Sequence, residues 1–240
     1  MSKSSLIVVT GGSGRFGSIL KSFKSKKKNY LFPSKKQLNI LNINSIKKYL
    51  KKKKPKILLH LAGLSRPMKI HDKDINKSIN LNIIGTSNIV TVCSKLNIKL
   101  IYFSTNYVYP YKKGFYKETD PVNPSNNYAW SKLGGECAVQ MYKNSLIIRL
   151  CMTEKPFVHQ FAFKDLITNF IFQEDFVKII PKLIKHKGII NFGGKTMSVY
   201  NFAKKTKKDI KGVLAFKLLK KKIPLNHSMN LKKINKILND

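Results

Sequence analysis

The chain has 240 residues, enough to bury a sizeable hydrophobic core, and its 42% hydrophobic content is that of a globular protein. It carries 47 Lys and Arg against 11 Asp and Glu, a formal net charge of +36. Only three of the basic residues are arginines, and the lysines are scattered over the whole length. Arginine binds phosphates and base edges with two hydrogen bonds at once, which lysine does not. We therefore expect no specific nucleic-acid partner, only salt-sensitive adhesion to polyanions.

The cysteines and the apolar runs indicate the cellular compartment in which the protein is expected. Cys93, Cys137 and Cys151 form no C-x-x-C pair, which is typical of reduced thiols inside the cell. The first apolar run is too short for a secretion signal, and no stretch approaches the length of a membrane span. We therefore expect a cytoplasmic protein with no membrane partner. No second ligand at metal spacing accompanies His60, so we expect no metal site.

An apolar run at Leu6–Thr10 leads into four glycines within seven positions, and helical residues follow to Ser25. This order predicts a strand, a phosphate-binding turn and a helix, because glycines let the backbone approach an anion and the helix start offers free N–H groups. The glycines match two dinucleotide-binding spacings, Gly12-x-Gly14-x-x-Gly17 and Gly11-x-x-Gly14-x-x-Gly17.

A short second strand at Asn29–Phe32 is followed by Ser34, Lys35 and Lys36. Folds that bind NAD place an acidic residue here to hold the adenosine ribose. Hydroxyl and ammonium groups attract the extra phosphate of NADP instead, and Arg15 in the turn adds a cation. We therefore favour NADP(H) over NAD(H). The alternative is that these lysines merely share the general excess.

The middle of the chain continues the alternation of helices and strands. Asn39 lies in a short segment whose amides can face adenine. A helix is expected at Ser45–Lys54 with Ser45 as its N-cap, then a buried strand that contains His60 and ends in a turn of small residues. We interpret His60 as a packed residue. A long helix is expected at Ile75–Leu96, with Gly85 marking close packing against another helix.

A further strand, Lys99–Thr105, ends in hydroxyl side chains at the carboxyl edge of the expected sheet, where open α/β sheets bind ligands. After a long loop, Tyr128 and Lys132 open a helix that runs to about Tyr142. Residues four apart share a helical face, so the ammonium can stabilise the phenolate and lower the tyrosine pKa for acid–base work. The pair alone arises by chance in many helices. Its order and separation from the other motifs make it significant.

Taken together, these motifs resemble the extended short-chain dehydrogenase/reductase superfamily, and within it the sugar-nucleotide-modifying branch that is like dTDP-4-dehydrorhamnose reductase. The resemblance covers most of the chain and is strongest in the first 150 residues. The matching segments are Thr10–Gly17, His60–Gly63, Phe103–Tyr109, Gly114–Pro121, Asn123–Pro124, Tyr128 with Lys132 and Glu136, Ile148–Arg149, Glu174–Asp175, Asn191–Gly194 with Ser198, and Pro224–Asn226.

The resemblance implies a Rossmann-type, doubly wound parallel α/β sheet, with an NAD(P)-binding domain at residues 1–150 and a short substrate-side region at 151–240. It also implies a catalytic set in which Tyr128 donates a proton, Lys132 lowers the pKa of that tyrosine and holds the nicotinamide ribose, and Thr105 binds the substrate carbonyl. The cofactor would contact Gly11, Ser13, Gly14, Arg15, Phe16, Gly17, Ser34, Lys35, Asn39, Leu61, Ala62 and Gly63, as well as Tyr128 and Lys132.

Two departures from the family pattern stand out. Asn106 replaces the aspartate that usually follows the catalytic threonine, and the Asp-Glu pair of the related dehydratases is missing. The segment between Arg149 and Glu174 is also shorter than usual, which predicts an abbreviated lid.

We expect NADPH-dependent reduction of a keto group on a nucleotide-linked sugar, an activity of dTDP-rhamnose and polysaccharide biosynthesis. An NAD(P)-dependent epimerase and a non-catalytic NAD(P)-binding subunit are the alternatives. A homodimer is possible. The sugar and the nucleotide stay open.

Overall fold

The computed structural model describes residues 5–24, 27, 29–110, 112–219 and 225–239. The chain divides into two compact units, each made of separate segments. The first contains Met1–Ser104, Ser125–Ile148 and Ile184–Ile189, and the second contains Thr105–Pro124, Arg149–Leu183 and Ile190–Asp240. The chain crosses between the units several times, and the expected division at residue 150 lies close to the crossing between Ile148 and Arg149. As a domain boundary it stays a prediction.

A six-stranded sheet runs through the fold in the order β10-β5-β4-β3-β1-β2. Its strands are β1 (Ile7–Thr10), β2 (Tyr30–Leu31), β3 (Ile57–His60), β4 (Lys99–Thr105), β5 (Ser145–Leu150) and β10 (Gly188–Phe192). β1 pairs in parallel with β2 and β3, and β3 pairs in parallel with β4, with Thr10 opposite His60 and His60 opposite Tyr102. This arrangement confirms the predicted Rossmann-type α/β class.

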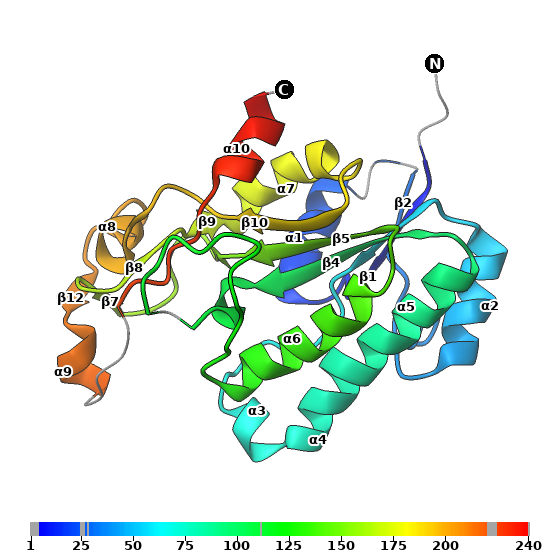
Figure 1. Cartoon of the computed structure of the whole chain (residues 1–240), viewed down its shortest axis with the longest axis horizontal. Coiled ribbons are helices and arrows are strands. Elements are labelled where there is room, and N and C mark those ends of the chain that lie inside the picture. Colours follow the sequence, from blue (N-terminus) through cyan, green and yellow to red (C-terminus); the bar gives the residue numbers. More distant parts are fainter. Residues whose placement is uncertain (1–4, 25–26, 28, 111, 220–224, 240) are drawn as a thin grey trace. The chain divides into compact units, whose positions relative to one another are not determined.

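The sheet strands are buried because helices cover both faces of the first unit (Figure 1). Those helices are α1 (Arg15–Lys24), α2 (Ile43–Lys53), α3 (Ile70–Lys73), α4 (Ile75–Ser78), the π-helix η1 (Ile79–Ile84), α5 (Gly85–Lys95) and α6 (Asn127–Gln140). Val8, Leu58 and Leu100 pack in one core cluster with residues of α2, α5 and α6. Successive strand residues point to opposite faces. Phe103 accordingly packs against Phe16 of α1.

The start of α2 differs from the sequence expectation. Asn42 is its N-cap and accepts a hydrogen bond from the Ser45 backbone N–H at 2.9 Å. Ser45 therefore lies inside the first turn, and its hydroxyl accepts from the backbone N–H of Asn39 at 3.1 Å. The predicted Ser45 cap is wrong because an asparagine three residues earlier caps the same helix end, and asparagine is an equally good cap.

The expected long helix at Ile75–Leu96 consists of α4, η1 and α5 in direct succession. Two glycines, one in α5 and one in α6, allow other segments to pack closely against these helices. A Cβ on Gly85 would lie 2.7 Å from Ile40, which is in a turn and not in a helix as expected. The close approach of helices occurs at α6, where a Cβ on Gly134 would meet Ile83 at 2.7 Å.

The second unit is built from short elements. They are η2 (Asn106–Val108), β6 (Met152–Thr153), β7 (Phe161–Phe163), β8 (Ile167–Thr168), β9 (Ile171–Phe172), α7 (Gln173–Leu183), β11 (Met197–Ser198), α8 (Val199–Ala203), β12 (Lys211–Val213), α9 (Ala215–Leu219) and α10 (Lys232–Asn239). Ser198 is the N-cap of α8, and its hydroxyl accepts from the Asn201 N–H. Near the end of the chain, Met229 and Ile234 are buried and contribute to the core.

Strand pairs that sequence periodicity did not predict organise this unit. β11 pairs antiparallel with β8, while β12 with β7 and β6 with β9 pair in parallel. Each of these strands has only two or three residues. Such short strands show no readable alternation, which is why residues 151–172 gave no strand signal. Ser25 and Pro224, named in the sequence analysis, lie outside the described residues.

A buried hydrogen-bond cluster ties the second unit together. The Tyr109 hydroxyl accepts from Arg149 Nη1 at 2.8 Å and contacts Asn191 Oδ1 at 2.8 Å. The same guanidinium nitrogen donates to the Glu118 carbonyl at 3.1 Å. The Asn191 amide in turn donates to the Tyr116 carbonyl at 2.8 Å. A buried cation needs such partners, because leaving it unpaired costs several kcal/mol.

Removing the hydroxyl of Tyr109 tests this cluster. We expect Tyr109→Phe to lower the free energy of unfolding by about 1–3 kcal/mol, because it deprives a buried guanidinium and a buried amide of one partner. Urea unfolding followed by circular dichroism measures the change. Tyr49→Phe, at a half-buried position of α2, is the matched control and should change stability by less than about 0.5 kcal/mol. Equal effects of the two substitutions would contradict this account.

Candidate functional site

The predicted glycine turn connects β1 to α1. Gly11 has a φ of +73°, and a Cβ there would lie 2.6 Å from the Ala62 backbone nitrogen. The Gly14 N–H donates to the Gly11 carbonyl at 3.0 Å, which closes the turn just before α1. Ser13 and Gly14 are exposed. The turn therefore presents the start of a helix at the surface, with glycine required by both backbone conformation and space.

The two side chains that follow the glycines point to different surroundings. Arg15 is exposed and donates from Nη2 to the Ser65 hydroxyl at 3.0 Å, which links the start of α1 to the segment after β3. Phe16 is buried, with its ring centroid 5.9 Å from that of Phe103. Of these two expected cofactor contacts, Arg15 offers a charged side chain and Phe16 offers its backbone.

A polar chain joins the carboxyl ends of β1 and β3 to α5. Thr10 Oγ1 lies 2.8 Å from His60 Nδ1 and accepts from the Ala62 N–H at 3.2 Å. His60 Nε2 lies 3.1 Å from Thr86 Oγ1. Burial and the nearby Lys132 ammonium lower the pKa of His60 to about 3. His60 is therefore a neutral structural residue, which agrees with its interpretation as a packed side chain.

Asn82, in the π-helix η1, connects the segment after β3 to α6. Its side chain accepts from the Leu64 N–H at 2.7 Å, and it donates to the Leu64 carbonyl at 2.8 Å and to the Ser131 hydroxyl at 2.7 Å. The Ser131 hydroxyl donates to the Tyr128 carbonyl at 2.7 Å. A Cβ on Gly63 would lie 2.8 Å from the Asn82 side-chain oxygen. One buried amide therefore fixes the backbone around both Gly63 and Tyr128.

Tyr128 and Lys132 lie one turn apart on α6, whose N-cap is Asn126. The Lys132 ammonium is 4.1 Å from the centroid of the Tyr102 ring, and the Tyr102 hydroxyl donates to the Lys132 carbonyl at 3.0 Å. Burial lowers the pKa of Lys132 to about 7, against a smaller upward effect of Glu136. Strongly shifted pKa values cluster at functional sites, which makes Lys132 a candidate functional residue.

His71 is a neighbour of Tyr128 that sequence reasoning missed. It is buried on α3, its ring centroid lies 5.2 Å from that of Tyr128 in an edge-on arrangement, and its Nδ1 lies 2.7 Å from the Ser78 hydroxyl. Burial lowers the pKa of His71. Asp72 accepts from the Asn127 side chain at 2.9 Å, so α3 is anchored to the start of α6. No motif marks His71, because its role depends on folding against a helix about 57 positions away.

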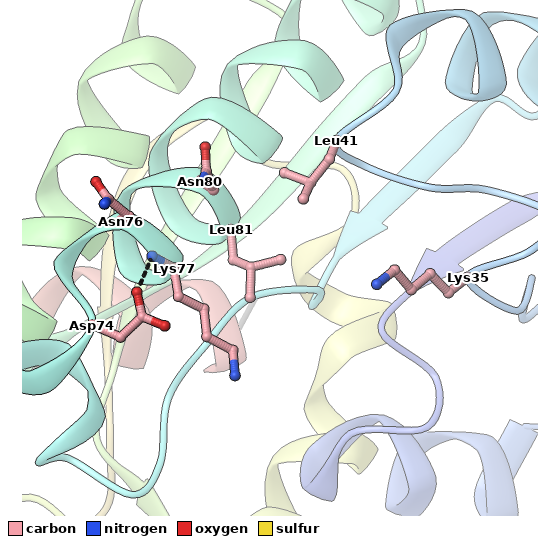
Figure 2. A pocket seen from close by; sticks show the side chains of 7 residues that line it. All are labelled: Lys35, Leu41, Asp74, Asn76, Lys77, Asn80 and Leu81. Carbon is pink, nitrogen blue, oxygen red and sulfur yellow. Dashed lines mark hydrogen bonds between the residues drawn. The ribbon is translucent and has the colours of Figure 1, made fainter.

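Lys35 lines a cavity of about 350 Å³ in the first unit. Figure 2 shows its side chain extending across the cavity toward Lys77 and Leu81. The Asp74 side chain caps α4 by accepting from the Lys77 N–H at 2.8 Å. The complete lining is Lys35, Leu41, Asp74, Asn76, Lys77, Asn80 and Leu81. The lining therefore carries two ammonium groups, one carboxylate and two apolar side chains.

Ser34 and Asn39, the other expected adenosine contacts, lie in the segment between β2 and α2. The Ser34 N–H donates to Gln37 Oε1 at 2.9 Å, and Ser34 itself is exposed. Asn39 Oδ1 accepts from the Leu41 N–H at 3.0 Å, so this amide oxygen shapes its own turn. Leu61 and Ala62 are half-buried, and Gly63 is exposed, directly after β3.

Thr105 belongs to the second unit. It is buried, and its hydroxyl accepts from the Tyr107 backbone N–H at 3.2 Å. Asn106, the departure from the family pattern, is also buried, and its amide lies 3.5 Å from the His227 carbonyl. The grouping of Thr105 with Tyr128 and Lys132 stays a prediction.

No group of three or more His, Cys, Asp or Glu side chains that could hold a metal ion occurs among the described residues. Within the same part of the chain, no helix is both long and apolar enough to cross a membrane.

A parallel sheet with a glycine turn after its first strand, and a Tyr-x-x-x-Lys helix in the same unit, defines a Rossmann-type fold of the dehydrogenase/reductase kind. A family model described as RmlD substrate binding domain matches residues 5–162. The chain belongs to this family, which confirms the predicted resemblance to dTDP-4-dehydrorhamnose reductases.

Two relatives of known name are similar in sequence. The methionine adenosyltransferase 2 subunit beta of Xenopus tropicalis is 29% identical over 140 residues, which is 55% of this chain and 42% of the relative. The dTDP-4-dehydrorhamnose reductase of Aggregatibacter actinomycetemcomitans is 26% identical over 205 residues, 80% of this chain and 63% of the relative. The chain thus aligns with less than half of the first relative and less than two thirds of the second.

The fold is similar to that of a crystal structure of dTDP-4-dehydrorhamnose reductase from Bacillus anthracis in complex with NADP. The TM-score is 0.83 at 21% identity, and the match covers 100% of this chain and 93% of the other. At this level of identity the likeness establishes the fold.

The lowered pKa of Lys132 predicts a pH-dependent stability. Because its pKa is about 7 in the folded protein and ordinarily 10.5, the unfolded chain binds more protons between these pH values. The group therefore destabilises the folded state at pH 7, and this penalty shrinks as the pH rises toward 10, so stability increases with pH. Lys132→Met should abolish this contribution. Urea unfolding at pH 7 and pH 9.5 gives the change in the free energy of unfolding between the two pH values. The change in wild type minus the change in Lys132→Met is the contribution of Lys132.

The matched control is Lys36→Met, at an exposed position. Because it leaves Lys132 in place, it should retain the wild-type dependence on pH. If the free energy of unfolding changed equally in Lys132→Met and in wild type between the two pH values, the lowered pKa of Lys132 would be contradicted.

Proposed function

We propose that the protein binds NADPH and reduces a keto group on a nucleotide-linked sugar, as an oxidoreductase of the short-chain dehydrogenase/reductase type. Membership of the RmlD family and the similarity to a dTDP-4-dehydrorhamnose reductase support this proposal. The single observation that carries it is the half-buried Lys132, seated over Tyr102 one helical turn after Tyr128. A desolvated ammonium beside a helical tyrosine suits acid–base chemistry, and a solvated surface lysine does not.

The residues present fit a nicotinamide dinucleotide. Side chains are excluded from the glycine turn, since a Cβ on Gly11 would collide with Ala62. The exposed Ser13 and Gly14 precede the first turn of α1, whose N–H groups favour a pyrophosphate. Arg15 at the same helix start adds positive charge. The known complex of the Bacillus anthracis reductase with NADP is consistent with this assignment.

The proposed mechanism assigns one task to each side chain. The glycine turn and Lys132 would hold NADPH, which when bound would provide the hydride needed for reduction of the sugar carbonyl. Tyr128 donates its phenolic proton to the carbonyl oxygen, so that an alcohol forms. The Lys132 ammonium stabilises the resulting phenolate and holds the nicotinamide ribose. Thr105 donates a hydrogen bond to the same carbonyl oxygen before transfer.

Tyr128→Phe tests the proton donor. We expect it to reduce turnover of a dTDP-4-keto-6-deoxy sugar by about two to four orders of magnitude, because the variant has no proton to give. NADPH binding, followed by its fluorescence, should stay within about threefold of wild type, since the ring is retained. Normal turnover by Tyr128→Phe would contradict the mechanism.

Tyr107→Phe, at a half-buried tyrosine of the second unit, is the control for loss of a hydroxyl.

Net consumption of NADPH separates reduction from the alternative of an epimerase, which returns the hydride to its substrate.

Lys35 and Lys77 support the preference for NADP(H). Both line the cavity of Figure 2, together with the apolar Leu41 and Leu81. A ribose phosphate would be attracted by two ammonium groups, and an adenine ring by the apolar side chains. The Asp74 carboxylate in the same lining opposes a phosphate, but one of its oxygens caps α4, and the two lysines leave the lining with a net positive charge.

Lys35→Glu tests the cofactor preference. We expect the ratio of NADPH affinity to NADH affinity to fall by about tenfold or more, because a carboxylate replaces an ammonium in the cavity. Binding of both cofactors by fluorescence titration at fixed salt provides the ratio. Lys48→Glu makes the same charge change at an exposed residue of α2 outside the lining, and it should shift the ratio by less than about threefold. Equal shifts of the affinity ratio in both variants would contradict a contact between Lys35 and the cofactor.

A second candidate is a non-catalytic NAD(P)-binding subunit. It is favoured by the sequence similarity to proteins named as the beta subunit of a methionine adenosyltransferase. Titration of NADPH with and without a panel of keto sugar nucleotides distinguishes the two functions. A reductase oxidises the cofactor in the presence of its substrate, whereas a binding subunit only retains it. A cytoplasmic location and a homodimer are proposed as well, and size-exclusion chromatography with light scattering tests the latter.

A further inference from the structure

Glu136 is a buried carboxylate in a chain with few acids. The first unit contains three acidic residues, Asp72, Asp74 and Glu136, and two of them are exposed. Glu136 has no exposed surface. A buried carboxylate is unfavourable unless it is hydrogen-bonded and paired. Its presence among so many lysines calls for a specific partner.

The surroundings of Glu136 supply both requirements. The Ser104 hydroxyl, near the carboxyl end of β4, donates to Glu136 Oε2 at 2.7 Å. Glu136 also follows Lys132 by four positions on α6, which places the two side chains on one helical face. The carboxylate is therefore held by a strand, and it lies one helical turn after Lys132.

Lys132 is held from a second direction. Its ammonium lies 4.1 Å from the Tyr102 ring centroid, and the Tyr102 hydroxyl binds the Lys132 carbonyl at 3.0 Å. Tyr102 and Ser104 are two residues apart on β4, so their side chains leave the strand on the same face. The same strand thus holds the lysine through Tyr102 and the carboxylate through Ser104.

We propose that Glu136, held by Ser104, is a positioning residue for Lys132 that keeps the desolvated ammonium charged and seated over Tyr102. This inference rests on the proposed function, in which Lys132 serves Tyr128 and the cofactor ribose. Without the carboxylate, burial would favour the neutral amine, which can neither stabilise a phenolate nor donate as an ammonium. The positive effect of Glu136 on the pKa of Lys132 agrees with this role.

The other titratable groups around Lys132 do not replace Glu136. His60 on β3 is neutral, since its pKa is about 3, and it offers no negative charge. Tyr102 on β4 has its pKa raised by burial and stays protonated. Tyr128 on α6 is the group that Lys132 is proposed to serve. Glu136 is therefore the carboxylate that compensates the ammonium.

Carbon-13 NMR of the full chain labelled with [ε-¹³C]lysine tests the proposal without cofactor or substrate. In wild type, the signal that disappears in Lys132→Met should titrate near pH 7. In Glu136→Gln, which preserves shape and the hydrogen bond from Ser104, we expect the midpoint to fall by about one pH unit or more. In Ser104→Ala, where the charge remains but is less firmly held, we expect a smaller fall.

Asp175→Asn is the matched control, because Asp175 is exposed and pairs with Lys178 at 3.3 Å. It removes one negative charge and should leave the Lys132 midpoint unchanged. An unchanged midpoint in Glu136→Gln would overturn the proposal, since a merely structural glutamate would not affect the titration of Lys132. If circular dichroism shows that Glu136→Gln is unfolded, Ser104→Ala decides alone: a lowered midpoint supports the proposal and an unchanged one overturns it. Because the measurement contains no cofactor, a failure of the reductase function would leave its result intact.

Discussion

The burial of one ammonium group is the constraint on which the proposed site depends. Lys132 is on α6, which packs against η1 and α5 in the first unit, and the ring of Tyr102 covers its ammonium. Removing this cation from water is unfavourable, and the compensation comes from an aromatic face and a buried carboxylate. The result is a lysine whose pKa of about 7 lies near neutral pH. The role proposed for Lys132 beside Tyr128 needs the charged form, so the carboxylate that opposes the effect of burial is as necessary as the burial itself.

Two polar connections hold the rest of this unit around that lysine. The first runs from Thr10 through His60 to Thr86 and links the strand before the glycine turn to α5. The second runs from the segment after β3 through Asn82 to Ser131, inside the first turns of α6. The π-helix that carries Asn82 is a local irregularity of a kind that is frequent at functional sites. The cofactor turn and the Tyr-Lys helix therefore belong to one hydrogen-bonded framework.

The sequence predicted the features that are set by local pattern. The glycine turn, the buried strands of the sheet and the helix with Tyr128 follow from spacing and periodicity, and the structure contains each of them. Sequence reasoning missed contacts that form across long separations. Ser104 meets Glu136 over 32 positions, and His71 meets Tyr128 over 57. No local pattern announces such a pair, and the short strands of the second unit are too brief to show alternation.

The central claim is that this chain is a reductase whose Tyr-Lys pair acts on a keto sugar nucleotide. The most direct measurement is isotope transfer from NADPH deuterated at the transferable C4 position, with dTDP-4-keto-6-deoxy sugars as substrates and mass spectrometry of the products. The account predicts a product alcohol that carries one deuterium, with one NADPH consumed per product. A chain that binds NADPH tightly and yet transfers no deuterium to any keto sugar nucleotide would contradict it.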